Sequence, residues 1–350
     1  MVEKVISQAW YQDQAWIKLF SPLSHLYLRQ HEKRKRIAIE NRRRPFAVPV
    51  VVVGNITVGG TGKTPLIIYL ANALRDRGIR VGVISRGYGG QPPQEPYIVS
   101  QNDDPSICGD EPLLISKSTC APVVIGRDRS AAAEKLLQND VQLVLSDDGL
   151  QHYALPRQYE IAVVDGERYF GNGRLLPAGP LREPIERLEN VDFIVRNGGE
   201  SDGPMSCQNY DIEFDASYRM APSGWVNVQS GTRVPLDFIG FDAYKETVHA
   251  IAGIGNPSRF FSTLGEFGID VTEHIFPDHH RYTEDDFSFV ESMNKTKVLM
   301  TTKDALKCRD FAGPDFWALD IDLAFDNTAS GQDSGDFLLL ELQNLLARPT

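Results

Sequence analysis

The sequence predicts an α/β protein with a doubly wound parallel sheet and a second, smaller α/β lobe. From residue 46 to about 200, short apolar segments alternate with segments of helical periodicity, a pattern typical of βαβ units. The first apolar segment leads into a glycine-rich turn and then into a helix. A second alternation begins at residue 249. A chain of 350 residues is long enough for both units and a sizeable core.

Composition and charge restrict the class of protein. The composition is ordinary for a globular chain, which excludes global disorder. The net charge of −11 argues against a general nucleic-acid binder, so we expect no nucleic-acid partner. No continuous apolar segment of the secretory type begins the chain. The cysteines lie far apart without a C-x-x-C motif, which favours reduced thiols over disulfides or a zinc site: Cys108, Cys120, Cys207 and Cys308.

Residues 1–44 predict a helical N-terminal segment that is both amphipathic and basic. Residues 3–43 look helical, with a restart at Ser21-Pro22. The apolar part is interrupted by Lys18 and His25 and is too short to span a bilayer. Eight Arg and Lys residues lie between 29 and 44. Two interpretations remain open: a helix on an anionic membrane surface, or a helix packed on its own domain with a solvated basic end. The apolar stripe consists of Trp10, Trp16, Ile17, Leu19, Phe20, Leu23, Leu26 and Tyr27.

Residues 45–200 are expected to form the core lobe, and residues 201–248 a linker or β-hairpin. The linker is rich in Gly, Ser and Asp and holds only short apolar pieces. For the core lobe we expect strands at 48–53, 81–85, 122–125, 141–146, 160–165 and 192–196, and helices at 64–76, 111–118 and 128–138.

Residues 249–350 are expected to form the smaller lobe. A strand from His249 leads into a glycine turn that ends at Pro257. The remaining elements expected here are helices at 258–267, 283–293 and 336–346, and strands at 270–276, 297–301 and 316–322.

The stretch from Val50 to Pro65 predicts a phosphate-binding P-loop. A β-branched strand is followed by a glycine-rich turn, by Lys63-Thr64 and by a helix. In this motif backbone N–H groups face the phosphates, the lysine reaches the β- and γ-phosphates, and the hydroxyl of Thr64 ligates Mg²⁺. Thr57 stands where the consensus has glycine. The expected phosphate-binding residues are Gly59, Gly60, Thr61, Gly62, Lys63 and Thr64.

Two carboxylates follow the apolar strand at 141–146. P-loop enzymes place an aspartate at the end of a neighbouring strand to hold Mg²⁺ directly or through water. Asp147 and Asp148 are therefore candidate metal ligands, and the sequence leaves open which of them lies closer to the metal.

Other strand ends also carry reactive side chains. Asp110 opens a helix, where it is either an N-cap or a carboxylate at the substrate hydroxyl. The long Gly- and Pro-punctuated loop at 166–184 is a candidate substrate-binding region. Candidate substrate residues at these ends are Arg86, Arg127, His152, Asn172, Arg174, Arg182 and Glu183.

Histidines follow a strand in the smaller lobe. His279 is a candidate general base, because a histidine at a strand end of a lobe that closes on a nucleotide suits that role. The adjacent His280 is the alternative. The turn at Thr302-Lys303-Asp304 is a weaker candidate for contact with a base or ribose.

Three function classes fit these features. A phosphotransferase needs an acceptor site, which the smaller lobe, the 166–184 loop and Asp110 could supply. An ATPase switch of the partitioning or metal-assembly type has a deviant P-loop like this one, but with a signature lysine where this chain has Val58. A nucleotide-sensing module at a membrane would need only the P-loop and the basic helix, and would leave the strand-end residues unexplained.

Several ordered blocks resemble the tetraacyldisaccharide 4'-kinases (lipid A 4'-kinases). The resemblance runs from about residue 15 to 310 and favours the transferase class over the two others. The blocks are 52–65 (VVGNITVGGTGKTP), 85–89 (SRGYG), 109–112 (GDEP), 147–152 (DDGLQH), 171–184 (GNGRLLPAGPLREP), 253–257 (GIGNP), 276–279 (FPDH) and 302–305 (TKDA).

The resemblance implies ATP-dependent phosphorylation of the 4'-hydroxyl of a lipid A disaccharide 1-phosphate, with ATP and Mg²⁺ bound. It implies a peripheral location at the cytoplasmic face of the bacterial inner membrane, so the membrane surface becomes an expected partner and no obligate protein partner is expected. It also implies that Asp110 is a catalytic carboxylate that acts with His279, beside Lys63 at the phosphates. His152, Arg182 and Glu183 fall on matching blocks and would assist metal, phosphate or acceptor placement.

Overall fold

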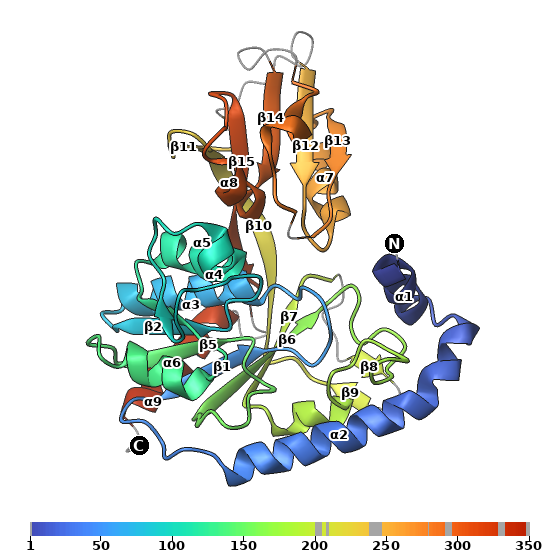
Figure 1. Cartoon of the computed structure of the whole chain (residues 1–350), viewed down its shortest axis with the longest axis vertical. Helices are drawn as coiled ribbons and strands as arrows, with labels where there is room; N and C mark the ends of the chain where they lie inside the picture. The colour runs from blue at the N-terminus through green and yellow to red at the C-terminus, as the bar shows by residue number, and fades with distance from the viewer. Residues whose placement is uncertain are drawn as a thin grey trace.

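The structure is a computed structural model that describes residues 2–199, 205–207, 210–237, 247–278, 280–290, 296–327 and 333–347. Figure 1 shows two lobes joined by a pair of long strands, with a long N-terminal helix lying along the edge of the larger lobe that faces away from the smaller lobe. The larger lobe holds the P-loop and is called the P-loop lobe here.

One sheet runs through both lobes. Its order is β13 (Thr272–Ile275), β12 (Thr247–Ala252), β14 (Thr296–Thr301), β15 (Phe316–Phe325), β10 (Ala216–Asn227), β7 (Phe193–Asn197), β6 (Tyr159–Asp165), β1 (Val50–Gly54), β5 (Leu143–Asp147), β2 (Val81–Ser85), β4 (Val123–Ile125) and β3 (Tyr97–Ile98). The short β11 (Arg233–Val234) pairs with β10. Pairing is parallel within each lobe's central strands, whereas β10 and β15 run antiparallel where the lobes join.

Helices cover both faces of the sheet in the P-loop lobe, as a doubly wound fold requires. On one face α3 (Lys63–Asp76), α5 (Asp110–Thr119) and α9 (Ser334–Ala347) pack their apolar residues against the strands. On the other face lie α6 (Arg129–Leu136) and the 3-10 helix η2 (Ile185–Asn190). The short α4 (Pro105–Cys108) precedes α5. The expected strands and helices of this lobe are confirmed to within about two residues.

The smaller lobe has α7 (Pro257–Glu266) on one face of its strands and α8 (Thr302–Cys308) on the other. The helix expected at 283–293 is wrong, because only a 3-10 turn, η3 (Glu284–Phe287), forms among residues 283–290. Phe287 and Phe289 both pack into this lobe. Two residues that are two positions apart do not share a helix face, so a helix could not bury both.

Two further segments differ from expectation. The linker at 201–248 contains an antiparallel pair, β8 (Met205–Cys207) and β9 (Tyr210–Ile212), but continues into β10, a twelve-residue strand of the main sheet. A register shift between Pro222 and Gly224 interrupts β10 and conceals its pattern in the sequence. The terminal helix, expected in the smaller lobe, is α9, and it packs against α3 in the P-loop lobe.

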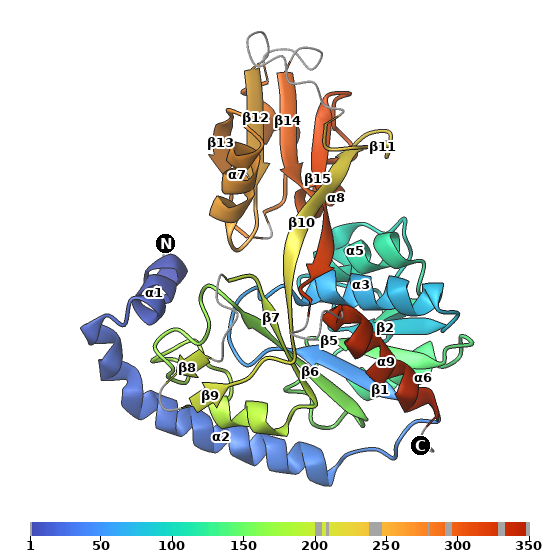
Figure 2. The same cartoon turned by 180° about the vertical axis from the view of Figure 1, so that it is seen from behind.

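The N-terminal segment forms three pieces, α1 (Val2–Tyr11), the 3-10 helix η1 (Ala15–Phe20) and α2 (Ser21–Glu40). The expected restart at Ser21-Pro22 is confirmed, because α2 begins there with proline in its first turn. Figure 2 shows α2 following the edge of the P-loop lobe beside β8 and β9. Within the described ranges, none of the helices combines the length and apolar character that a membrane span requires.

Candidate active site

The P-loop connects β1 to α3 and has the expected glycine geometry. Gly59 and Gly62 adopt φ angles of 101° and 90°, which favour glycine. A side chain on Gly62 would also collide with Asn197 and Tyr218. Thr57 needs no glycine, because its backbone has an ordinary φ and bridges to Leu181. The departure from the consensus at this position is therefore compatible with the loop.

Two buried side chains hold the carbonyl groups of the P-loop. Asn197 Nδ2 donates to the carbonyl of Thr61 at 3.0 Å, and the hydroxyl of Tyr218 donates to the carbonyl of Gly62 at 2.9 Å. With these carbonyls engaged from outside, the neighbouring N–H groups are free to face an anion. Asn197 ends β7 and Tyr218 lies on β10, so no local signal in the sequence could have identified either residue.

Lys63 lies among oxygen atoms at the strand ends. Its Nζ donates to Asn55 Oδ1 at 3.2 Å and forms an ion pair with Asp148 Oδ1 at 3.5 Å. Arg182 contacts both carboxylate oxygens of Asp148, at 2.9 and 3.1 Å. Burial acts to raise the pKa of Asp148, but the two cations outweigh it and lower the pKa below its usual value.

Asp147 has a different environment, although it is adjacent. It is 1% exposed and accepts a hydrogen bond from Ser85 Oγ at Oδ2, 3.1 Å away. Its Oδ1 is buried and has no hydrogen-bond partner among the described residues. Burial, followed by repulsion from Glu111 and Asp148, raises the pKa of Asp147 to about 7. The charge of Asp148 is thus balanced by Lys63 and Arg182, whereas Asp147 keeps an oxygen without a hydrogen-bond partner among the described residues.

Asp110 lies at the beginning of α5 and connects the two lobes. Gly109, with a φ of 89°, is the N-cap residue, so the N-cap interpretation of Asp110 is wrong. The Asp110 side chain is largely buried, and its Oδ2 lies 3.0 Å from Nζ of Lys307 on α8. The next residue, Glu111, is near enough to Asp147 for its charge to raise the pKa of that carboxyl. The beginning of α5 therefore lies near the strand-end carboxylates.

A cationic cavity of about 360 Å³ lies beside these carboxylates. Arg129 connects it to the site, because its buried guanidinium donates to the carbonyl of Asp147 at 3.1 Å. Burial, followed by Arg129 and Arg86, lowers the pKa of His152 to about 4, so this imidazole is neutral at pH 7. The lining residues are Asn41, Arg43, Arg127, Asp128, Arg129, Ser130, His152, Ala154 and Leu155.

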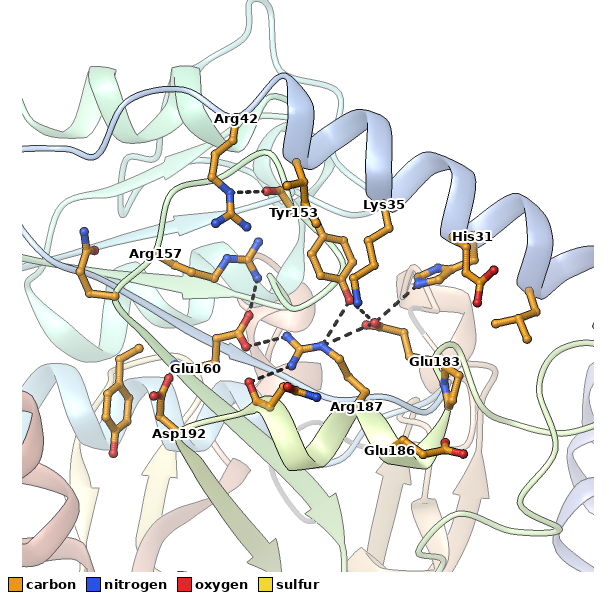
Figure 3. A pocket seen from close by; sticks show the side chains of 17 residues that line it. His31, Lys35, Arg42, Tyr153, Arg157, Glu160, Glu183, Glu186, Arg187 and Asp192 are labelled. Carbon is orange, nitrogen blue, oxygen red and sulfur yellow. Dashed lines mark hydrogen bonds and ion pairs between the residues drawn. The ribbon is translucent and has the colours of Figure 1, made fainter.

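A second cavity, of about 580 Å³, separates α2 from the core and contains a buried charge network (Figure 3). Glu183 is 1% exposed and accepts hydrogen bonds from Gln151 Nε2 at 2.6 Å and from the hydroxyl of Tyr153. His31 of α2 and Arg187 of η2 lie 3.5 and 3.6 Å from the same carboxylate. Glu183 is therefore surrounded by donors, and it adjoins Arg182, which contacts Asp148.

The other candidate substrate residues of the 166–184 loop contact the loop itself and the N-terminal segment. Asn172 Nδ2 donates to the carbonyl of Ala178 at 2.9 Å, and the backbone N–H of Asn172 donates to the carbonyl of Trp10 at 2.9 Å. Arg174 donates to Ser21 Oγ at 3.1 Å. These contacts attach the loop to the N-terminal helices.

The histidines of the smaller lobe are described only in part. His279 lies outside the described residues. The alternative, His280, makes contacts within its own lobe: its Nε2 lies 3.1 Å from Asp286, and its ring stacks on Phe276 at 4.7 Å between centroids. Lys303, of the weaker nucleotide-contact candidate, pairs with Asp278 at 3.4 Å.

Comparison with known proteins places this arrangement in context. Residues 16–334 match the family described as tetraacyldisaccharide-1-P 4'-kinase. A tetraacyldisaccharide 4'-kinase of Pseudomonas fluorescens (strain SBW25) is 46% identical over 318 residues, which is 90% of each chain. One of Alcanivorax borkumensis is 45% identical over 321 residues, 90% of this chain and 92% of that protein. The crystal structure of LpxK from Aquifex aeolicus in complex with ATP superposes with a TM-score of 0.74 at 26% identity, covering 95% of this chain and 99% of that one.

Proposed function

The chain belongs to the tetraacyldisaccharide-1-P 4'-kinase family, and we propose that it transfers the γ-phosphoryl group of ATP to the 4'-hydroxyl of a lipid A disaccharide 1-phosphate. It is a kinase, and the reaction belongs to lipid A biosynthesis. The observation that carries the proposal is the pair of unequal carboxylates beside Lys63 of the P-loop. A phosphotransferase has to neutralise the phosphates and position a metal at the same strand ends.

Mg²⁺ is the metal that fits these residues. Asp147 has a buried Oδ1 without a hydrogen-bond partner among the described residues, whereas both oxygens of Asp148 contact cations. Asp147 and the hydroxyl of Thr64 would therefore hold the ion, with Asp148 orienting Lys63. No three His, Cys, Asp or Glu side chains in the described part of the chain group into a metal site. That suits Mg²⁺, which takes one or two carboxylates and fills its other positions with phosphate oxygens and water. The ion would neutralise charge on the phosphates.

Asp110 is the candidate for the carboxylate at the acceptor hydroxyl. Because the end of α5 faces Asp147 and is largely buried, a hydroxyl bound there would meet the carboxylate away from bulk water. As the hydroxyl oxygen attacks the γ-phosphorus, its proton passes to Asp110 or to His279, and ADP leaves. Lys63 stays with the transferred phosphoryl group throughout.

The cationic cavity is the candidate site for the sugar and its phosphate. Arg127 and His152 line it, and Arg86 lies close enough to lower the pKa of His152. A neutral imidazole suits a hydrogen bond to a sugar hydroxyl, and the arginines suit an anion. Arg182 would act on the phosphates together with Lys63. Asn172, Arg174 and Glu183 would act indirectly, by holding the loop and the Arg182 backbone.

The outward face of the N-terminal helices suits a membrane surface. The inward face of α2 is polar: Ser24 Oγ donates to the carbonyl of Leu175 at 2.8 Å, and the hydroxyl of Tyr27 donates to the carbonyl of Arg182 at 3.0 Å. Large apolar side chains instead point to solvent, together with basic ones. Of the two interpretations of this segment, the outward face supports a peripheral location at the cytoplasmic face of the inner membrane. The exposed apolar residues are Trp16, Leu19, Phe20, Leu23 and Leu26.

The test is incubation of the protein with γ-labelled ATP and an acylated glucosamine disaccharide 1-phosphate in detergent micelles. The expected result is a labelled bisphosphate that forms only with both substrates, and its loss in Lys63→Ala. Steady ATP hydrolysis without the acceptor, and no labelled lipid with it, would instead favour the ATPase-switch class.

A further inference from the structure

We propose that Lys307 is a positioning residue that holds Asp110 in its working orientation when the two lobes are together. The inference rests on the proposed function, because it takes Asp110 as the carboxylate at the acceptor hydroxyl. Lys307 belongs to α8 of the smaller lobe, and Asp110 belongs to α5 of the P-loop lobe. These helices are in contact where the lobes meet, as both views indicate (Figures 1 and 2).

The first support is the burial of the ion pair. The side chains of Lys307 and Asp110 are 5% and 11% exposed, and Nζ lies 3.0 Å from Oδ2. A pair at this distance on a protein surface would contribute little, because water and salt screen it. A buried pair is screened far less, so the position of the ammonium restricts where the carboxylate lies. Among the described residues, Asp110 is the only carboxylate within ion-pair distance of Lys307.

The second support is the way the smaller lobe holds Lys307. Asp304, three residues earlier on α8, is fully buried and accepts hydrogen bonds from Thr301 Oγ1 at 2.7 Å and from the hydroxyl of Tyr282 at 3.1 Å. The backbone N–H of Gly253 donates to it at 3.2 Å. Lys307 Nζ lies 5.9 Å from the centre of the Tyr282 ring. The lysine thus lies on a helix that buried hydrogen bonds attach to the smaller lobe, and its side chain reaches the other lobe.

The third support is the connectivity of the lobes. Within the described residues, β10 and β15 carry the chain between them. Two strands permit bending, so a second contact is needed to define the distance between α5 and α8. A cation on one lobe and a catalytic carboxylate on the other meet only when that distance is short. Through Lys307, the orientation of the Asp110 side chain therefore depends on the distance between the two lobes.

The test compares Lys307→Met with Lys307→Arg in the transferase assay on the full chain. We expect Lys307→Met to lower kcat by about 30-fold, while the KM for ATP changes by less than about twofold because the P-loop is untouched. Lys307→Arg keeps the charge and should recover kcat to within about threefold of the unmodified protein. Lys117→Met is the matched control, since Lys117 lies on the same helix as Asp110, α5, and is near enough to Arg309, just beyond α8, for that charge to lower the pKa of Lys117. The kcat of Lys117→Met should stay within about twofold of that of the unmodified protein.

Combination with Asp110→Asn separates positioning from general destabilisation. If Lys307 acts through Asp110, the double variant Asp110→Asn, Lys307→Met should be no slower than Asp110→Asn alone. Binding of a non-hydrolysable ATP analogue checks that each variant is folded. Lys307→Gln replaces Lys307→Met if the methionine variant does not fold.

Three outcomes would overturn the inference: kcat of Lys307→Met within about threefold of the unmodified protein, equal impairment of Lys307→Arg and Lys307→Met, or additive losses in the double variant. Full activity of Asp110→Asn would overturn both this inference and the proposed role of Asp110. An inactive Asp110→Asn beside an active Lys307→Met would overturn the inference alone.

Discussion

The α2 side of the P-loop lobe and the smaller lobe both contact the candidate active site through buried charges, but the two sets of contacts differ. From the α2 side, Glu183 is surrounded by Gln151, Tyr153, His31 and Arg187, all within the P-loop lobe and its N-terminal helix. From the smaller lobe, an ion pair joins Lys307 to Asp110. The contacts of Glu183 lie within one lobe and do not depend on the other lobe. The Lys307–Asp110 pair, in contrast, forms only while the two lobes are together.

The difference separates stability from activity. A carboxylate with several buried donors contributes mainly to the free energy of unfolding, because its loss removes several buried hydrogen bonds at once. A carboxylate that meets a cation across the interface between the lobes, as Asp110 does, is expected to contribute mainly to turnover. Perturbing each side should therefore change a different measured quantity, and the following predictions test this from the largest expected effect to the smallest.

The largest effect is expected on the smaller-lobe side. Asp110→Asn should lower kcat about 1,000-fold, because the acceptor hydroxyl loses the carboxylate proposed to act on it, alone or with His279. The melting temperature should fall by only a few degrees, since the amide keeps the size and shape of the carboxylate and its oxygen can face Lys307. Steady-state kinetics and thermal unfolding, measured on the same preparation, check the prediction. Activity within tenfold of the unmodified protein would contradict the catalytic role of Asp110.

On the α2 side, stability should respond most. Glu183→Ala should lower the free energy of unfolding by about 2 kcal/mol, because the hydroxyl of Tyr153 loses its acceptor and Arg187 loses one of its two carboxylates. Urea denaturation followed by fluorescence measures this. Glu32→Ala is the control: Glu32 lines the same cavity but is exposed, and its replacement should change stability by less than about 0.5 kcal/mol. Equal effects of the two substitutions would remove the distinction between the two sides.

Between the two sides lies Asp147, whose replacement should stabilise the protein in a pH-dependent way. Burial raises its pKa from 3.8 to about 7 in the folded state. Over that range the folded protein holds a proton that the unfolded chain has lost, so this contribution to stability is full below pH 3.8 and is lost as the pH rises to about 7. Asp147→Asn removes the buried charge, so it should raise the free energy of unfolding at pH 8 and change it little at pH 4.

Thermal unfolding of Asp147→Asn at the two pH values, without Mg²⁺, is the measurement. The same variant should lose Mg²⁺-dependent transferase activity, so gain of stability and loss of function coincide at this residue. A stabilisation that is equal at both pH values would show that charge burial is not its cause.

The smallest effect is expected on the outward face of the N-terminal helices. Leu19→Ser combined with Leu23→Ser should reduce binding to anionic vesicles about tenfold, because two exposed leucines no longer enter the lipid. Turnover on micellar substrate should stay unchanged. Leu340→Ser on α9 removes an equally exposed leucine elsewhere and should not affect vesicle binding. If the double variant still binds vesicles fully, the membrane interpretation of this face loses its support.

Point substitutions are sharper here than deletion of residues 1–28. That deletion would also remove Trp10, Ser24 and Tyr27, which donate to the carbonyls of Pro177, Leu175 and Arg182. If the shortened protein moved from the membrane fraction to the soluble fraction, the shift could come from loss of lipid contact or from damage to the site.

The sequence predicts local features of this protein better than distant ones. Val50–Gly54, the glycine turn and α3 follow from neighbouring residues, and Asp147 and Asp148 follow from the end of one apolar strand. Asn197, Tyr218 and Lys307 reach the site only through packing of distant elements, and no spacing in the sequence encodes that. The unequal environments of Asp147 and Asp148 likewise depend on Arg182, which comes from a loop more than thirty residues later.

After the smaller lobe, β15 leads the chain back to the P-loop lobe, and this order affects how the protein folds during its own synthesis. Leu338, Leu342 and Leu345 of α9 complete the apolar layer beneath α3, although they follow the whole smaller lobe in the chain. Domains usually fold as units while the chain leaves the ribosome. Here the interior of the nucleotide-binding lobe is complete only after the smaller lobe has been translated. A fragment that stops after residue 315 should therefore lack part of this layer and be prone to aggregate.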